Sequence, residues 1–245
     1  MLGLGGPSVA FDSGAGAAPP PPTAPGFVKL LGTANANLTS SVTVPTLAQA
    51  SAGNAVLVFL STSSNPTHGA LALTVTGIAD SIGTSYTVES TALAHPVRPQ
   101  WLGFGKLAAA LPASSSVTVS LTYTLRNGCG VTIIVAEYAG ITVFRGKSAS
   151  TVNTTYKALA PPTTGAPGPG GTLEIVTWVY SLTVAATVAV TATFVKRLQT
   201  RYNPGRFSSS TATKWITQAV ADRVGDTTVH WTPGGWLAAW LFSLA

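Results

Sequence analysis

Residues 116–140 read SVTVSLTYTLRNGCGVTIIVAEYAG and contain two kinds of β-strand pattern, separated by a turn. In the first segment, 116–124, apolar residues alternate with polar ones, as in a strand with one buried face. The second segment, 130–140, is a nearly unbroken apolar run, which is typical of a strand that is covered on both faces. The intervening RNGCG supplies turn-forming residues. The stretch therefore predicts a half-buried strand followed by a strand inside a layered structure.

The same patterns recur along the chain, which predicts an all-β fold. Further strands are expected at residues 40–47, 54–62, 72–79, 85–91 and 100–107. Thr, Val and Ile together number 66, whereas Glu, Gln, Lys and Met number 14, so β-branched residues far outnumber good helix formers. With 25 Gly and 17 Pro as turn residues, the chain is expected to form a jelly roll or β-sandwich of short strands.

The second half of the chain repeats the plan of the first. Residues 37–61 align with 153–181, residues 100–121 with 214–231, and residues 130–140 with 235–245. We therefore expect two pseudo-repeats of about 110 residues each, the size of a small β-sandwich. Their expected bounds are 27–145 and 146–245. Whether they form two sandwiches or one composite jelly roll stays open.

Residues 1–26 are expected to form an extended arm. AGAAPPPPTAP (15–25) lacks backbone donors at its prolines and favours polyproline geometry. We expect Pro19, Pro20, Pro21 and Pro22 to dock this arm on a partner. No Lys or Arg occurs in the first 28 residues, so no secretory signal is expected. The apolar stretch 175–195 is rich in β-branched residues and predicts two strands rather than a membrane span.

Composition argues against cofactors and metals. The single cysteine, Cys129, excludes an intramolecular disulfide and a cysteine-based zinc site. The three histidines are scattered at His68, His95 and His230. No P-loop and no G-x-S-x-G turn is present. We expect no cofactor.

The carboxylates do not predict an active site. Only seven Asp and Glu residues occur, and the pair Glu89 and Glu137 is the one that could in principle act as the two carboxylates of a glycosidase. Nothing in their spacing favours that role. Cys129 has no histidine nearby in the sequence to activate it. We therefore expect no catalytic residues and no enzymatic activity.

Aromatic residues are concentrated near the end of the chain and offer candidate contacts with a glycan. Four of the six tryptophans lie in the last 31 residues. Trp236 and Trp240 share a face at strand period, as core residues do. Trp231, at a strand end, and Tyr202, in an expected loop, are better placed to stack on a sugar.

A basic stretch follows the apolar one. Five cations lie within residues 196–214, and Arg197, Arg201 and Arg206 are candidate partner contacts. The net charge is +6, so an anionic cell-wall polymer, a nucleic acid or an acidic neighbouring subunit could meet this stretch. No nucleic-acid-binding motif accompanies it. We expect a subunit contact or a solvated loop rather than a nucleic-acid site.

Several segments in chain order carry a resemblance to a known family. They are SVAFDSGAGA (8–17), SAGNAVLVFLS (51–61), VTVSLTYT (117–124), VTIIVAEYAGI (131–141), GGTLEIVTWV (170–179) and GWLAAWLFSLA (235–245). In this layout the chain resembles the jelly-roll minor tail proteins of phages that infect actinobacteria. The resemblance covers nearly the whole chain and implies a virion component at the tail tip, with contact to the host envelope. It implies no catalytic residues, and it includes neither the proline arm nor the basic stretch.

The sequence thus predicts a non-enzymatic structural protein of a phage virion, assembled in the host cytoplasm. Only 8% of the residues are charged, against about 25% in ordinary soluble proteins. Such a surface is poorly protected against association, so we expect contacts with other virion proteins and a homo-oligomer. The alternatives are a capsid decoration or head-fibre protein, and a carbohydrate-binding module that recognises a cell-surface glycan.

Overall fold

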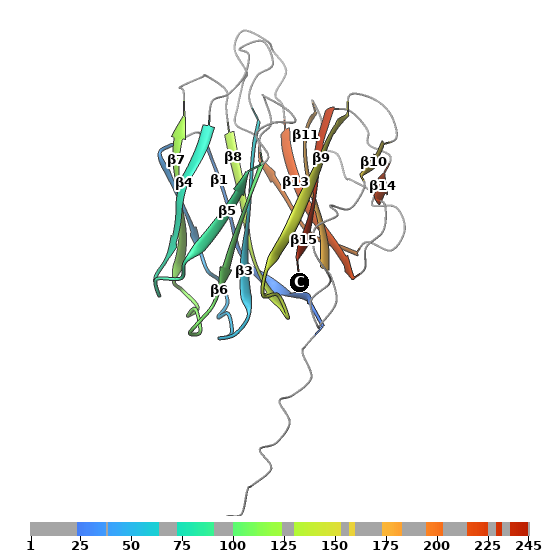
Figure 1. Cartoon of the computed structure of the whole chain (residues 1–245). Coiled ribbons are helices and arrows are strands. Elements are labelled where there is room, and N and C mark those ends of the chain that lie inside the picture. Colours follow the sequence, from blue (N-terminus) through green and yellow to red (C-terminus); the bar gives the residue numbers. More distant parts are fainter. Residues whose placement is uncertain are drawn as a thin grey trace, which may run out of the picture.

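The described part of the chain is built from β-strands (Figure 1). The computed structural model describes residues 24–37, 39–63, 73–90, 100–123, 130–152, 157–159, 173–182, 195–202, 215–224, 229–231 and 236–244. These residues form strands, turns and bends and no helix. The predicted all-β fold class is confirmed. Residues 1–23 of the expected arm lie outside this description.

The first half of the chain builds two antiparallel sheets. The first large sheet has the order β1-β8-β3-β6-β5, and the first small sheet has the order β2-β7-β4. The strands are β1 Gly26–Asn37, β2 Ser41–Pro45, β3 Ala55–Ser63, β4 Leu73–Asp80, β5 Tyr86–Ser90, β6 Gln100–Lys106, β7 Ser116–Tyr123 and β8 Gly130–Ala139.

The second half builds two further sheets. The second large sheet has the order β12-β13-β11-β15-β9, and the second small sheet is the pair β10-β14. The strands are β9 Phe144–Val152, β10 Lys157–Leu159, β11 Leu173–Leu182, β12 Val195–Tyr202, β13 Trp215–Val224, β14 Val229–Trp231 and β15 Trp236–Leu244. All of their pairings are antiparallel.

One apolar core lies between the first large and first small sheets and makes them a β-sandwich. Strand β7 alternates buried and more exposed residues, and its buried face includes Val117 and Val119. They pack with Val58 of β3 and Ile133 of β8. Burial of such aliphatic side chains stabilises the fold by roughly 1.5–3 kcal/mol each. The half-buried pattern predicted for residues 116–124 is therefore correct for the part of the segment that β7 covers.

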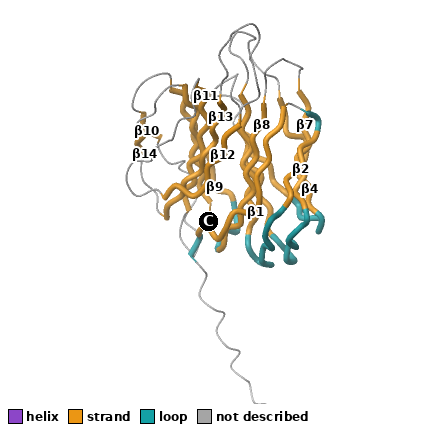
Figure 2. The backbone as a smooth tube through the Cα atoms, turned by 180° about the vertical axis from the view of Figure 1, so that it is seen from behind, coloured by secondary structure: helices purple, strands orange, loops and turns teal. Residues whose placement is uncertain are grey.

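A second apolar core covers the opposite face of the first large sheet. Leu57 and Phe59 of β3 and Ile134 of β8 belong to it, together with Leu173 of β11 in the second large sheet. Strand β11 contacts β3, and β12 contacts β8. The two large sheets therefore face each other across this core, and both views of the backbone show them next to each other (Figure 1, Figure 2). This arrangement explains why β3 and β8 are continuous apolar runs, since each is covered on both faces.

The two large sheets share one strand order. We number the five strands of each large sheet in the order in which they occur along the chain. From β1 to β5, the strands of the first large sheet then lie in the order 1-5-2-4-3. In the second, the order from β9 to β12 is the same. In each half the second strand also pairs with the next-to-last strand, as β2 with β7 and β10 with β14. The segments that align in the sequence therefore occupy equivalent places in the sheets.

Strands β1 and β9 do not match any strand that the sequence predicted. Strand β1 mixes Lys29, glycines and asparagines without a regular period, and its pairing with β8 is shifted at two places. Strand β9 begins at Phe144, two residues before the repeat boundary that we set from the sequence. Its partner is β15 of the second large sheet.

Gly32 lets β1 cross closely over the end of β2. A Cβ at this position would lie 2.3 Å from the backbone oxygen of Pro45 and 3.0 Å from Val44 Cγ1. No side chain fits at 2.3 Å from a carbonyl oxygen, so only glycine permits this approach. The glycine therefore helps to join the edge of the large sheet to the small sheet.

Candidate functional site

The residues expected to contact a partner are distributed over two different sheets. Arg197, Arg201 and Tyr202 lie on β12, an edge strand of the second large sheet. Tyr202 was expected in a loop, but it is the last residue of β12, paired with Ile216. Trp231 ends β14 of the second small sheet, as its expected position at a strand end requires.

The remaining expected contacts lie outside the residues that the structure describes. These are Arg206 of the basic stretch and Pro19, Pro20, Pro21 and Pro22 of the arm. Their roles stay predictions. The sites that can be built from side-chain geometry lie in the first half of the chain.

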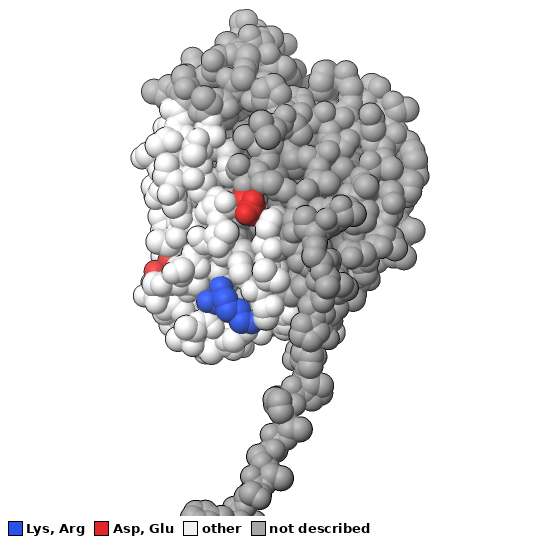
Figure 3. All heavy atoms as spheres, viewed as in Figure 1, with Lys and Arg blue, Asp and Glu red and all other residues white. Residues whose placement is uncertain are grey.

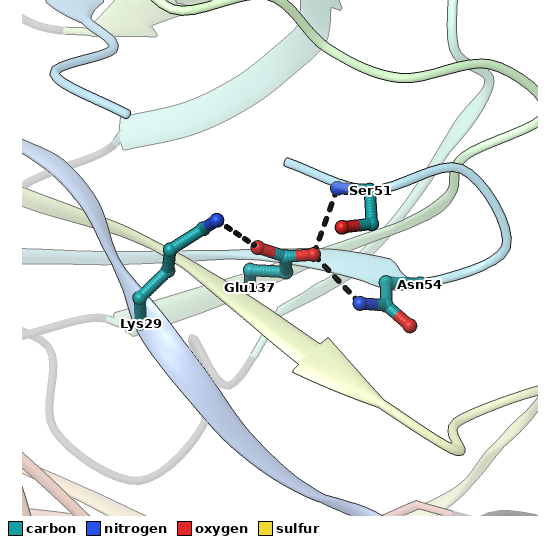
Figure 4. Close-up of polar contacts among 4 residues, drawn as sticks. All are labelled: Lys29, Ser51, Asn54 and Glu137. Carbon is teal, nitrogen blue, oxygen red and sulfur yellow. Dashed lines mark hydrogen bonds and ion pairs between the residues drawn. The ribbon is translucent and has the colours of Figure 1, made fainter. Parts of the chain in front are cut away.

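Glu137 is the centre of a buried polar cluster at the end of the first sandwich (Figure 4). Its Oε1 accepts hydrogen bonds from the backbone N–H of Ser51 at 2.8 Å and from Asn54 Nδ2 at 2.6 Å. Its Oε2 lies 3.2 Å from Lys29 Nζ. The carboxylate thus joins β8 to the loop before β3 and to the edge strand β1.

Two opposing effects set the protonation of Glu137. Burial by itself raises the pKa of the carboxyl group, but the hydrogen bonds from Ser51 and Asn54 and the nearby positive charge of Lys29 lower it, and the net pKa lies below its ordinary value of 4.5. The group is therefore ionised at neutral pH. Because its side chain is 0% exposed, it has no surface left with which to meet a ligand, and its role is structural.

The register of the first large sheet separates Glu137 from Glu89. Glu137 lies opposite Val56, on the face of the first core, whereas Glu89 lies opposite Leu102, on the other face. Three strand spacings, about 14 Å, also separate β8 from β5. The carboxylates of a glycosidase face one bond across roughly 5–10 Å. These two residues therefore do not form such a pair.

Asp80 organises the turn between β4 and β5. Its Oδ1 accepts hydrogen bonds from the N–H groups of Ile82 and Thr84, both at 3.0 Å, and its Oδ2 accepts one from the Tyr86 hydroxyl at 3.0 Å. Burial opposes ionisation of Asp80, but the hydrogen bonds outweigh it and lower the pKa of the carboxyl group. Gly83 takes the φ of +73° that this tight turn requires. The turn is thereby held in one conformation.

A hollow of about 380 Å³ lies beside this turn and opens to solvent. We call it the β5–β6 hollow; it is lined chiefly by Thr84, Ser85, Thr87, Phe104, Lys106 and Ala108. Thr87 lies directly opposite Phe104 in the sheet, so the two side chains share a face. The glycines at 103 and 105 in QWLGFGK alternate with Phe104 and Lys106. That alternation is the sequence feature from which this face could have been predicted.

Comparison of the chain with protein families, curated proteins and solved structures found no match. Among the described residues, no group of three or more His, Cys, Asp or Glu side chains is placed to hold a metal ion. In the same part of the chain, no helix has the length and apolar character to cross a membrane.

Proposed function

We propose that the chain is a non-enzymatic structural protein of a phage virion, a minor tail protein built from jelly-roll sandwiches and placed at the tail tip. The resemblance of its sequence segments to that family motivates the proposal. Layered sandwiches suit a particle subunit, because they supply stable surfaces for packing against neighbours.

The surface of the first sandwich supports this role because it is poor in charge. Of the side chains that the structure describes, the charged ones are Lys29, Asp80, Glu89, Lys106 and Glu137. Figure 3 shows an almost uncharged described surface on the face in view. Freely soluble domains carry charge on about a quarter to a third of their surface residues, whereas the centres of interfaces are depleted of it.

Exposed aliphatic side chains add to this argument. Val28 and Leu30 on the edge strand β1 are 43% and 37% exposed, Val143 is 50% exposed, and Leu47, next to β1, is 77% exposed. The Leu47 N–H donates to the Leu31 carbonyl, which fixes the loop against this edge. A charge-poor surface with exposed aliphatic groups is what an assembled subunit buries, and this observation carries the proposal. It also supports a homo-oligomer.

The contacts proposed for the N-terminal arm and for the second half of the chain rest on the sequence. We infer that the arm, with Pro19 to Pro22, docks on a neighbouring virion subunit, and that the second half, with Trp231 and Arg201, faces the host surface. An extended proline segment loses little conformational entropy when it binds, which suits it to a docking role.

Immunogold electron microscopy of phage particles whose genome encodes this chain tests the proposal. We expect label at the distal end of the tail. Label over the head would instead make the chain a capsid decoration or head-fibre protein. Particles without label would overturn both virion roles and favour the carbohydrate-binding module.

Deletion of residues 1–23 tests the arm separately, because the deletion ends before Ala24 and leaves β1 complete. We expect the shortened chain to fold with an unchanged unfolding midpoint but to be lost from purified particles. Incorporation at the level of the full chain would show that the arm does not dock it.

A further inference from the structure

The β5–β6 hollow has the features of a small-molecule site, and we propose that it binds an acidic saccharide. Its volume of about 380 Å³ lies at the lower end of the range for sites that hold small ligands. It lies on the face of the first large sheet that carries the second core, but beyond β1, β3 and β8, the strands that contact the second large sheet.

The lining of the hollow is chemically suited to a sugar. Ser85 and Thr87 are exposed and contribute hydroxyl groups that both donate and accept hydrogen bonds, as sugar hydroxyls require. Phe104 is half-buried and packs on the second core, and its remaining surface lies in the hollow. An aromatic side chain held in this way offers a flat apolar surface to the C–H face of a sugar ring.

Lys106 selects for a negative charge on the ligand. Its ammonium group donates a hydrogen bond to the Ile141 carbonyl at 3.0 Å, which fixes its position at the hollow. An ammonium group has three donors, so two remain for a ligand. A carboxylate is the group that best satisfies them, because hydrogen bonds between ions are about twice as strong as neutral ones.

The carboxylates near the hollow do not cancel this charge. Asp80 is not part of the lining, and its two oxygens already accept hydrogen bonds from Ile82, Thr84 and Tyr86. Glu89 lies opposite Leu102, four residues along β6 from Lys106, which corresponds to about 13 Å. That separation exceeds the screening length of about 8 Å at physiological salt.

The wall of the hollow is organised before any ligand arrives. Asp80 holds the turn through Ile82 and Thr84, and the sheet register holds Thr87 opposite Phe104. A rigid site loses less entropy on binding than a loop that must order itself. The inference does not depend on the proposed virion role, because a purified chain would bind the sugar wherever it is located in a particle.

Nuclear magnetic resonance titration of the purified full chain tests this site. The probe is trigalacturonate, and its fully methyl-esterified form is the uncharged control. We expect trigalacturonate to shift the backbone amide signals of Thr87, Phe104 and Lys106, and the ester to bind at least about tenfold more weakly, which corresponds to about 1.4 kcal/mol.

Four variants separate the site from general charge effects. Lys106→Gln should weaken trigalacturonate binding about tenfold, whereas Lys106→Arg, which keeps the charge, should retain most of it. Thr87→Val, at an exposed position, should fold normally and weaken binding several-fold. Lys157→Gln on β10 lowers the net charge equally and should leave binding unchanged.

Three results would overturn the inference. The first is the absence of any shift at millimolar trigalacturonate, and the second is equal binding of the acid and its methyl ester. The third is equal loss of binding in Lys106→Gln and Lys157→Gln, because it would assign the attraction to net charge alone.

Discussion

Lys29 and Glu137 are direct partners in the register of β1 and β8, and their charged groups lie 3.2 Å apart where β1 forms the edge of the first large sheet. Lys29 is 38% exposed and can keep part of its hydration, whereas Glu137 is fully buried. Removal of the two side chains should therefore have unequal effects, since only the buried charge depends entirely on protein partners.

Glu137→Gln should lower the free energy of unfolding by about 1–3 kcal/mol, because an amide cannot satisfy Ser51, Asn54 and Lys29 together. Urea denaturation measures this change. Lys29→Gln is the matched variant, and we expect it to cost less than about 1 kcal/mol because its partner keeps two hydrogen bonds. Equal effects of the two variants would contradict the structural role of Glu137.

The same carboxylate predicts how stability depends on pH. The pKa of Glu137 is lower in the folded chain than its ordinary value of 4.5, so the unfolded chain binds a proton first as the pH falls. Its stabilising contribution should be complete above about pH 5 and decrease below pH 4.5. Urea midpoints between pH 7 and pH 3 should fall more for the wild type than for Glu137→Gln. Parallel curves would show that Glu137 is not linked to folding.

Gly32→Ala should destabilise the fold by about 1–3 kcal/mol, because the new Cβ would overlap the Pro45 carbonyl oxygen and force the backbone to shift. Gly77→Ala on β4 is the matched control, since a Cβ there meets nothing within 4 Å. Thermal unfolding of the two variants should separate them by several degrees. A Gly32→Ala melting temperature equal to the control would mean that β1 does not approach β2 so closely.

Leu47→Lys should change association without changing stability. The side chain is 77% exposed, so its replacement should alter the free energy of unfolding by less than about 0.5 kcal/mol. If the surface around β1 is an interface between copies, a lysine there should shift sedimentation profiles toward the monomer. Thr43→Lys, on the exposed face of the small sheet, controls for added charge. The same shift in both variants would speak against a contact at Leu47.

Local patterns in the sequence were sufficient for much of the fold. Alternation over residues 116–124 and the continuous run over 130–140 correctly distinguished β7 from β8, because a side chain's neighbours in a sheet depend on which face it points to. Strand β1 was not predicted, because its two register shifts against β8 interrupt the alternation of side chains between the two faces of the sheet. The start of β9 at Phe144 was not predicted either, because residues typical of turns and residues typical of strands are mixed in this segment.

The site residues could not be found by such patterns. Lys29, Ser51 and Asn54 are distant from Glu137 in the sequence, and only the pairing of β1 and β3 with β8 brings them to its carboxylate. The β5–β6 hollow likewise requires the turn at Asp80 to lie beside β6.

The sequence by itself determined the all-β class and the two kinds of strand, because both follow from which side chains favour a pleated strand and from their period along it. Tertiary structure alone decided that the two large sheets share one strand order and cover each other, and that Glu89 and Glu137 lie on opposite faces. The physical reason is that strand order and register depend on contacts between residues far apart in the chain, which no local period encodes.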